Sequence, residues 1–212
     1  CYFGEGAASE GDFHAGLNMA AVHKAPVIFF CRNNGYAIST PANEQFKGDG
    51  IACRGVGYGI KAIRVDGADI LAVYKATQMA RDYALEHEEP ILIESIAYRL
   101  GAHSSSDDPS GYRSKEEEEL WRKNDPISRF RLWLVKQGWL DEEADKAKSD
   151  ALRQEILDAL KVAEKVAKPG IEHLMSDVYE TPIPLLNEQL EELKAHIRKY
   201  PDAYPVTAGR FE

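Results

Sequence analysis

Two stretches decide the fold of this chain: GEGAASEG at residues 4–11 and CRNNGYAIS at residues 31–39. A short apolar run, CYF, precedes the first stretch and predicts the end of a β-strand. Ser9 stands at an N-cap position before a helix of small residues. The run VIFFC at residues 27–31 predicts a second strand with no solvated face, which is typical of a parallel sheet covered on both sides. The order strand, helix, strand predicts one βαβ unit.

Two polar side chains leave these strands at the same end, Glu5 after the first strand and Asn34 after the second. Adjacent parallel strands end at one edge of a sheet, where ligands bind, so we expect both side chains to converge there. Mg²⁺ prefers carboxylate and other oxygen ligands together with phosphate oxygens. Gly6 permits close approach of the backbone to a diphosphate, and Gly35 permits a turn that exposes the carbonyl of Tyr36. The sequence therefore predicts a Mg²⁺ site for a diphosphate, formed by Glu5, Asn34 and the Tyr36 carbonyl.

Two simpler interpretations compete with a metal site. A dinucleotide site needs the pattern G-x-G-x-x-G, but position 9 is Ser and the next glycine is Gly11. Glu5 and Asn34 could also each be an ordinary polar residue at a strand end. Their combination with the flanking glycines favours metal binding over both alternatives.

The composition bounds the class of protein. With 212 residues, 44% of them hydrophobic and 29% charged, the chain suits one globular domain with a sizeable core. A net charge of -9 argues against a general binder of nucleic acid or anionic membrane, and no apolar run approaches the length of a membrane span. Cys1, Cys31 and Cys53 form no metal-binding spacing, which favours a reducing compartment. Because the chain opens with Cys inside a predicted strand, we expect further residues upstream.

Strands and helices continue to alternate after the first unit. Strands are predicted at residues 61–65 and 91–97, with a helix capped by Asp69 between them. The inward face of that helix is expected to carry Leu71, Tyr74, Ala76, Met79 and Tyr83. Residues 40–58 are expected to be a polar loop with several glycines. We therefore expect an α/β fold over residues 1–113, with a mostly parallel sheet and flanking helices.

The sequence becomes helical after this region, and residues 114–212 are expected to be a helical extension of the same domain. Helix-start signals stand at Ser114, at Asp125-Pro126 and at Asp141, and a last apolar stripe runs from Leu186 to Tyr200. The segments at 179–184 and 200–211 contain prolines and aromatic residues without periodicity, and such segments often pack on a partner chain.

A second informative stretch, RLGAHSSSDDPSGYRS at residues 99–114, follows the strand expected at 91–97. Its glycine, serine and aspartate content predicts a loop at the same sheet edge as Glu5 and Asn34, so its residues can reach a ligand there. His103 carries the one imidazole of this loop. A lone loop histidine is usually inert, but the position at this edge favours a role in moving or balancing charge.

GEG followed by NN resembles the thiamin diphosphate fingerprint GDG…NN, with Glu in place of the usual Asp. With RNNGYAIST and HSSSDDPSGYRS, the run GEGAASEGDFHAGLNMAA resembles the alpha subunit of the branched-chain 2-oxo acid dehydrogenase, over roughly residues 1–204. The resemblance implies the thiamin diphosphate-binding fold, with Glu5, Asn34 and the Tyr36 carbonyl on Mg²⁺. It implies that the cofactor is lined by Gly6, Ala7, Arg32, Ile38 and His103, with His103 also near the reacting substrate.

The resemblance also implies partners and regulation. A beta subunit, in an assembly of two alpha and two beta chains, would supply the carboxylate that activates the aminopyrimidine. A lipoyl-bearing acyltransferase core would take the acyl group. A regulatory kinase and phosphatase would act at Ser104 and Ser114. A phosphoryl group on Ser104 would face Asp107 and Asp108 and disorder the loop. The family further implies the mitochondrial matrix, a K⁺ site, if there is one, outside these residues, and neither a nucleic-acid nor a membrane partner.

The implied reaction is oxidative decarboxylation of branched-chain 2-oxo acids such as 2-oxoisovalerate, with acyl transfer to a lipoyl group. A pyruvate- or acetoin-type alpha subunit would share the Mg²⁺ motif, and a non-catalytic regulatory subunit could keep the fold. Retention of Glu5, Arg32, Asn34 and His103 together speaks against the non-catalytic alternative. Since catalysis would need the beta subunit, we expect these residues alone to be inactive.

Overall fold

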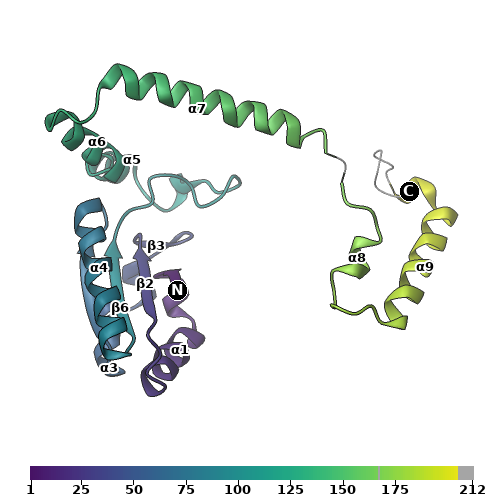
Figure 1. The fold of residues 1–212 in the computed structure, drawn as a ribbon, viewed down its shortest axis with the longest axis horizontal. Helices are drawn as coiled ribbons and strands as arrows, with labels where there is room; N and C mark the ends of the chain where they lie inside the picture. The colour runs from purple at the N-terminus through teal and green to yellow at the C-terminus, as the bar shows by residue number, and fades with distance from the viewer. Residues whose placement is uncertain (167, 205–212) are drawn as a thin grey trace. The chain divides into compact units, whose positions relative to one another are not determined.

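A computed structural model describes residues 1–166 and 168–204 of the chain (Figure 1). The chain divides into two compact units, Cys1–Asp141 and Glu142–Glu212. The sheet and the candidate site lie in the first unit.

The first unit is built on a four-stranded parallel sheet. Its strands are β1 (Tyr2–Gly4), β2 (Ile28–Asn33), β5 (Lys61–Asp66) and β6 (Ile91–Ile96). Their order in the sheet is β1-β2-β6-β5, and each neighbouring pair is parallel. The central strands β2 and β6 are mostly apolar, as expected of a sheet covered on both faces. The predicted mostly parallel α/β fold is confirmed.

Helices cover both faces of this sheet. The helices that pack on the sheet are α1 (Gly11–Val22), α3 (Ala52–Gly57) and α4 (Ile70–His87). Leu17 of α1 packs with Cys31 and Leu92 on one face, while Ala80 of α4 packs with Ile93 on the other face. Figure 1 accordingly shows β2 and β6 between α1 and α4. Alternate side chains of each central strand therefore enter two separate cores.

The inward face of α4 differs from the predicted one. Its buried residues are Ala76, Ala80 and Ala84. Leu71, Tyr74 and Met79, which were expected to face inward, are exposed by 50%, 69% and 54%. The other two predicted residues do face inward, because Ala76 is buried and Tyr83 is partly buried against the core around Ala80 and Ile93. Large Ile and Phe side chains of the sheet fill most of the space under α4, so its fully buried positions are alanines.

The prediction of a loop over residues 40–58 was wrong in part. A short hairpin, β3 (Tyr36–Ala37) with β4 (Thr40–Pro41), leads into α2 (Ala42–Gln45), and α3 follows. The glycines of this stretch are poor helix formers. Tertiary bonds override that preference, because the first amides of the α3 region donate to the buried carboxylate of Glu94.

Two short helices of the predicted extension belong to the first unit. They are α5 (Lys115–Arg122) and α6 (Pro126–Lys136). Tyr98 stacks on Trp121 of α5 at 5.0 Å, and Arg129 of α6 forms an ion pair with Asp66. These contacts lie within the first unit, which ends at Asp141. The helical extension was expected to begin at residue 114 and to belong to the same domain.

The second unit is helical, as predicted. It contains α7 (Glu142–Ala163), α8 (His173–Ser176) and α9 (Pro184–Lys199), with the 3₁₀ turn η3 (Pro201–Ala203). Of the segment predicted at 200–211, residues 205–211 lie outside the described residues. Within the described ranges, no helix is long and apolar enough to cross a membrane.

Candidate functional site

The candidate site begins at the end of β1, where Glu5 is fully buried. Its Oε2 accepts a hydrogen bond from the backbone N–H of Asn34 at 3.0 Å. Its Oε1 is buried and has no hydrogen-bond partner within the described part of the chain. An unpaired buried carboxylate oxygen is costly, and a cation is the partner that such an oxygen suits best.

The turn after β2 presents the other two predicted ligands. Gly35 has a φ of +85°, a left-handed conformation that favours glycine. The side-chain Oδ1 of Asn34 accepts from the N–H of Tyr36 at 3.1 Å, so one lone pair of that oxygen remains available. The Tyr36 carbonyl accepts a 3.4 Å hydrogen bond from Nη1 of Arg99. The structure thus brings Glu5, Asn34 and Tyr36 to one edge of the sheet, as the topology predicted.

The glycine that follows Glu5 is held against this turn. A Cβ on Gly6 would lie 2.7 Å from the Cβ of Ala37, closer than two carbon atoms can approach without displacement. Ala7 begins the 3₁₀ turn η1 (Ala7–Ser9) directly afterwards. Ile38 has a φ of +56°, and its carbonyl accepts from Nη2 of Arg99 at 2.5 Å. The backbone at Gly6 therefore approaches the second strand-end closely, which agrees with a cradle for a small anionic group.

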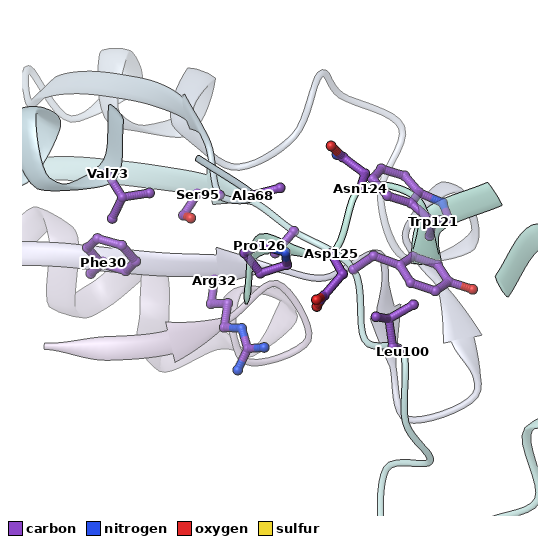
Figure 2. A pocket seen from close by; sticks show the side chains of 13 residues that line it. Phe30, Arg32, Ala68, Val73, Ser95, Leu100, Trp121, Asn124, Asp125 and Pro126 are labelled. Atoms are coloured by element: carbon purple, nitrogen blue, oxygen red, sulfur yellow. The ribbon is translucent and has the colours of Figure 1, made fainter. Parts of the chain in front are cut away.

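Arg32 lies on the opposite face of β2 from Cys31. It lines a cavity of about 230 Å³ (Figure 2). Asn34 and Tyr36 line a different cavity, of about 300 Å³, and Ala97, Tyr98 and Trp121 are common to both linings. Arg32 is thus beside the Glu5–Asn34 edge but lines a separate cavity from the predicted metal ligands.

The loop with His103 is tied to the same edge by a chain of hydrogen bonds. Arg99 donates to the hydroxyl of Tyr112 at 3.0 Å, and that hydroxyl donates to Oδ2 of Asp107 at 2.7 Å. The N–H of His103 donates to the same Oδ2 at 2.8 Å. The hydrogen bond from Tyr112, followed by that from His103, holds the pKa of the Asp107 carboxyl below its ordinary value. The imidazole of His103 itself is exposed.

Arg113 anchors both ends of this loop. Its guanidinium is buried, donates to the carbonyls of Arg99, Leu100 and Gly101, and forms a 2.7 Å ion pair with Glu118 of α5. A planar group with several fixed donors suits such a junction of carbonyls. The start and end of the loop are therefore held together at its base.

Glu117 of α5 connects Ser114, a predicted phosphorylation site, to Tyr36 in the turn after β2. Ser114 caps α5, its Oγ accepting from the N–H of Glu117 at 3.1 Å. The Oε1 of Glu117 accepts from the hydroxyls of Tyr36 at 2.8 Å and Tyr98 at 3.0 Å. Burial, and then the hydrogen bond to this carboxylate, raise the pKa of both tyrosines to about 12. Ser104 is exposed, with its Oγ 3.2 Å from that of Ser106.

Residues 1–172 match the family model described as "Dehydrogenase E1 component". The chain belongs to this family. It is 55% identical over 207 residues to "2-oxoisovalerate dehydrogenase subunit alpha, mitochondrial" of Mus musculus. The aligned residues make up 97% of this chain and 47% of that relative. The same protein of Homo sapiens is 55% identical with 46% coverage of its length, and "2-oxoisovalerate dehydrogenase subunit alpha 2, mitochondrial" of Arabidopsis thaliana is 49% identical over 205 residues, 96% of this chain and 43% of its own length. The chain spans about half the length of the curated relatives it matches. The resemblance drawn from the sequence motifs is confirmed.

Sequence reasoning missed two buried polar side chains next to the turn at Gly35. Asn33 and Glu94 are both buried and hydrogen-bonded to each other at 2.8 Å. A carboxylate inside the apolar strand ILIESI was the signal that could have found Glu94, because an acid in a fully buried strand needs dedicated partners. Among the residues that the structure describes, no three His, Cys, Asp or Glu side chains are grouped to hold a metal.

Proposed function

We propose that this chain is the part of a branched-chain 2-oxo acid dehydrogenase alpha subunit that holds the diphosphate and Mg²⁺ of thiamin diphosphate. The observation that carries the proposal is the buried Glu5 carboxylate, with one oxygen on the Asn34 amide and the other without a partner in the described part of the chain. One carboxylate with neutral oxygens and phosphate oxygens is a typical Mg²⁺ environment. The names of the relatives, all 2-oxoisovalerate dehydrogenase alpha subunits, support the substrate class.

The predicted ligands have separate tasks. Glu5 supplies a negatively charged carboxylate oxygen to Mg²⁺, Asn34 supplies a neutral amide oxygen, and Tyr36 supplies its backbone carbonyl oxygen. The amides around Gly6 and Ala7 lie where they can bind a diphosphate oxygen. These groups are held by the backbone of two adjacent strands, so the site is preorganised before the ligand arrives.

Two cationic or titratable side chains complete the proposed site. Arg32 is proposed to pair with a phosphate oxygen from the side of its own cavity, in the bidentate geometry that a guanidinium favours. His103 is proposed to hold or move a proton at the reacting substrate, since its loop is anchored to the metal turn through Asp107, Tyr112 and Arg99. Ile38 offers an exposed apolar side chain next to the turn. When bound, thiamin diphosphate supplies the carbanion chemistry that removes CO₂ from a 2-oxo acid.

The full activity is proposed to need partners. A beta subunit would provide the acid that activates the aminopyrimidine, and a lipoyl-bearing acyltransferase would accept the acyl group. The exposed Leu71, Tyr74 and Met79 of α4 are available for contact with another chain. The relatives' names support a mitochondrial location, for which we propose the matrix. Any K⁺ site is proposed to lie outside these residues.

Phosphorylation of Ser104 and Ser114 by a dedicated kinase is proposed to switch the site off, with a phosphatase restoring it. A phosphoryl group on Ser104 would lie near Asp107 and Asp108, whose carboxylates hold the loop through His103 and Ser110. Repulsion would then compete with the hydrogen bonds that order the loop. Ser114 is already the cap of α5, which links it to Tyr36 through Glu117.

The substrate class is tested by turnover. The full-length alpha chain, assembled with its beta subunit and supplied with Mg²⁺ and thiamin diphosphate, should decarboxylate 2-oxoisovalerate with a higher kcat/KM than pyruvate. A preference for pyruvate or acetoin would favour the other dehydrogenase classes. Metal-dependent cofactor binding without turnover of any 2-oxo acid would favour a non-catalytic subunit.

A further inference from the structure

Glu94 is a buried carboxylate in the centre of the sheet, fully covered on β6. Its Oε1 accepts from Nδ2 of Asn33 at 2.8 Å and from the N–H of Ile51 at 2.9 Å. Its Oε2 accepts from the N–H of Ala52 at 2.8 Å and from Nε of Arg64 at 3.1 Å. Burial alone would raise the pKa of Glu94, but the hydrogen bonds from Ala52, Asn33, Ile51 and Arg64 hold it below the ordinary value. The carboxylate is therefore ionised and fixed in direction at neutral pH.

The side chain of Asn33 connects Glu94 to the turn at Gly35, which lies between the proposed ligands Asn34 and Tyr36. While its Nδ2 donates to Glu94, its Oδ1 accepts from the N–H of Gly35 at 3.1 Å. An ionised carboxylate can only accept, so it selects the orientation of the amide in which Nδ2 faces Glu94 and Oδ1 faces Gly35. Without Glu94 the amide could rotate, so that its Nδ2 group would face the N–H of Gly35. Both groups are donors, so the hydrogen bond to Gly35 would be lost.

We propose that Glu94 is a positioning residue for the Mg²⁺ site: through Asn33 it fixes the turn at Gly35 that presents Asn34 and Tyr36 to the metal. The inference rests on the proposed function. Gly35 lies between the two residues whose oxygens are the proposed ligands, and its left-handed φ sets their relative direction. Ligand groups have to be held within about 0.5 Å of the working geometry by such outer contacts, and loss of one lowers metal affinity by about 10–100-fold.

The same carboxylate also holds the segment before α3. Gly50 is so close to Glu94 that a Cβ would lie 2.5 Å from its Oε1. The carboxylate of Glu94 thus bonds the first turn of α3 directly and is connected to the turn at Gly35 through Asn33. Replacing Glu94 itself would disturb both segments, so the sharper variant is Asn33→Ala, which removes the connection to Gly35 and leaves three donors on Glu94.

The test uses the full-length chain assembled with its beta subunit. Wild type, Asn33→Ala and Cys31→Ala are compared for the Kd of Mg²⁺ at saturating thiamin diphosphate, for amide hydrogen exchange at residues 34–37 without metal, and for Tm. Cys31 is the matched control, because it is fully buried on the same face of β2 and its side chain packs in the core. Both substitutions truncate a buried side chain, so both should lower Tm.

We expect Asn33→Ala to weaken Mg²⁺ binding about tenfold or more and to speed exchange at residues 34–37. Cys31→Ala should change the Kd by less than about twofold, since its contacts lie in the core. Equal Mg²⁺ affinity and unchanged exchange in Asn33→Ala would overturn the positioning role while leaving the proposed function intact. If wild type itself binds no Mg²⁺ with thiamin diphosphate, the proposed function fails and this inference fails with it.

Discussion

Glu5 and Asn34 are joined across two strand ends: the N–H of Asn34 donates to Oε2 of Glu5 at 3.0 Å, although 29 positions separate them in the sequence. The bond fixes one carboxylate oxygen and leaves Oε1 buried without a partner in the described structure. It forms because β1 and β2 are parallel neighbours in register from Tyr2 with Phe30 to Gly4 with Arg32. A hydrogen bond between a backbone amide of one strand end and a side chain of the next thus sets the geometry of the proposed Mg²⁺ site.

The close approach at Gly6 predicts a stability effect. Gly6→Ala should destabilise the fold by about 1–3 kcal/mol, because the new methyl group would meet Ala37 at 2.7 Å. Gly16→Ala is the control: Gly16 lies inside α1 with nothing within 4 Å, so the same chemical change should be neutral or stabilising. Urea unfolding of both variants measures the difference. Equal stability of the two variants would contradict the close packing at Gly6.

The anchor at Arg113 predicts a local effect on the loop. Arg113→Lys should expose residues 101–112 to proteolysis, because an ammonium group cannot satisfy three carbonyls and Glu118 together. The carbonyls left unpaired should cost about 1–3 kcal/mol of stability. Arg129→Lys is the control, since its ion pair with Asp66 is partly exposed and should be worth less than about 1 kcal/mol. Cleavage of the loop at the wild-type rate in Arg113→Lys would refute the anchoring role.

The buried carboxylate of Glu94 predicts a dependence of stability on pH. Its folded pKa is lowered from an ordinary value of 4.5, so its contribution is fully present above that value and is lost as pH falls through the folded pKa. The difference in unfolding free energy between wild type and Glu94→Gln should therefore be constant above about pH 5.5 and should shrink at lower pH. Denaturant unfolding at several pH values measures it. A difference that stays constant well below pH 4 would show that Glu94 is not ionised in the folded protein.

The position of Ser104 predicts the effect of a negative charge. Ser104→Glu should lower turnover and raise the proteolytic sensitivity of residues 101–112, because the new carboxylate adds to Asp107 and Asp108 near the hydrogen bond that holds His103. Ser104→Ala, which adds no charge, should keep both properties near those of wild type. Full turnover with an ordered loop in Ser104→Glu would count against the proposed switch.

The sequence predicted the sheet well where strands are continuously apolar. VIFFC and ILIESI predicted strands, and the corresponding β2 and β6 are the two inner strands of the sheet. It failed where tertiary bonds decide the structure. The α3 segment is rich in glycine, and only the carboxylate of Glu94 explains why it is helical. The inward face of α4 was predicted correctly at Ala76, which is buried, but wrongly at Leu71, Tyr74 and Met79, which are exposed. Hydrophobicity alone favours these larger residues, whereas the buried positions of the helix are occupied by alanines.

The site could be predicted as far as topology reaches. Parallel strands bring Glu5 and Asn34 to one edge whatever the details of packing. The roles of Arg113 and Glu117 could not be predicted, because each bonds groups that become neighbours only after the loop and α5 fold onto the sheet. Which face Arg32 occupies is likewise set by the register of β2 and not by its place next to the two asparagines.

The most direct test of the account is calorimetric titration of the assembled full-length protein with thiamin diphosphate, with and without Mg²⁺. Wild type should bind only when Mg²⁺ is present, and Glu5→Gln, which keeps the shape of the side chain, should weaken Mg²⁺-dependent binding by more than about tenfold, or about 1.4 kcal/mol. Asn34→Ala should do the same, while the exposed control Glu10→Gln should bind as wild type does. Unchanged binding in Glu5→Gln, or binding by wild type that ignores Mg²⁺, would contradict the account.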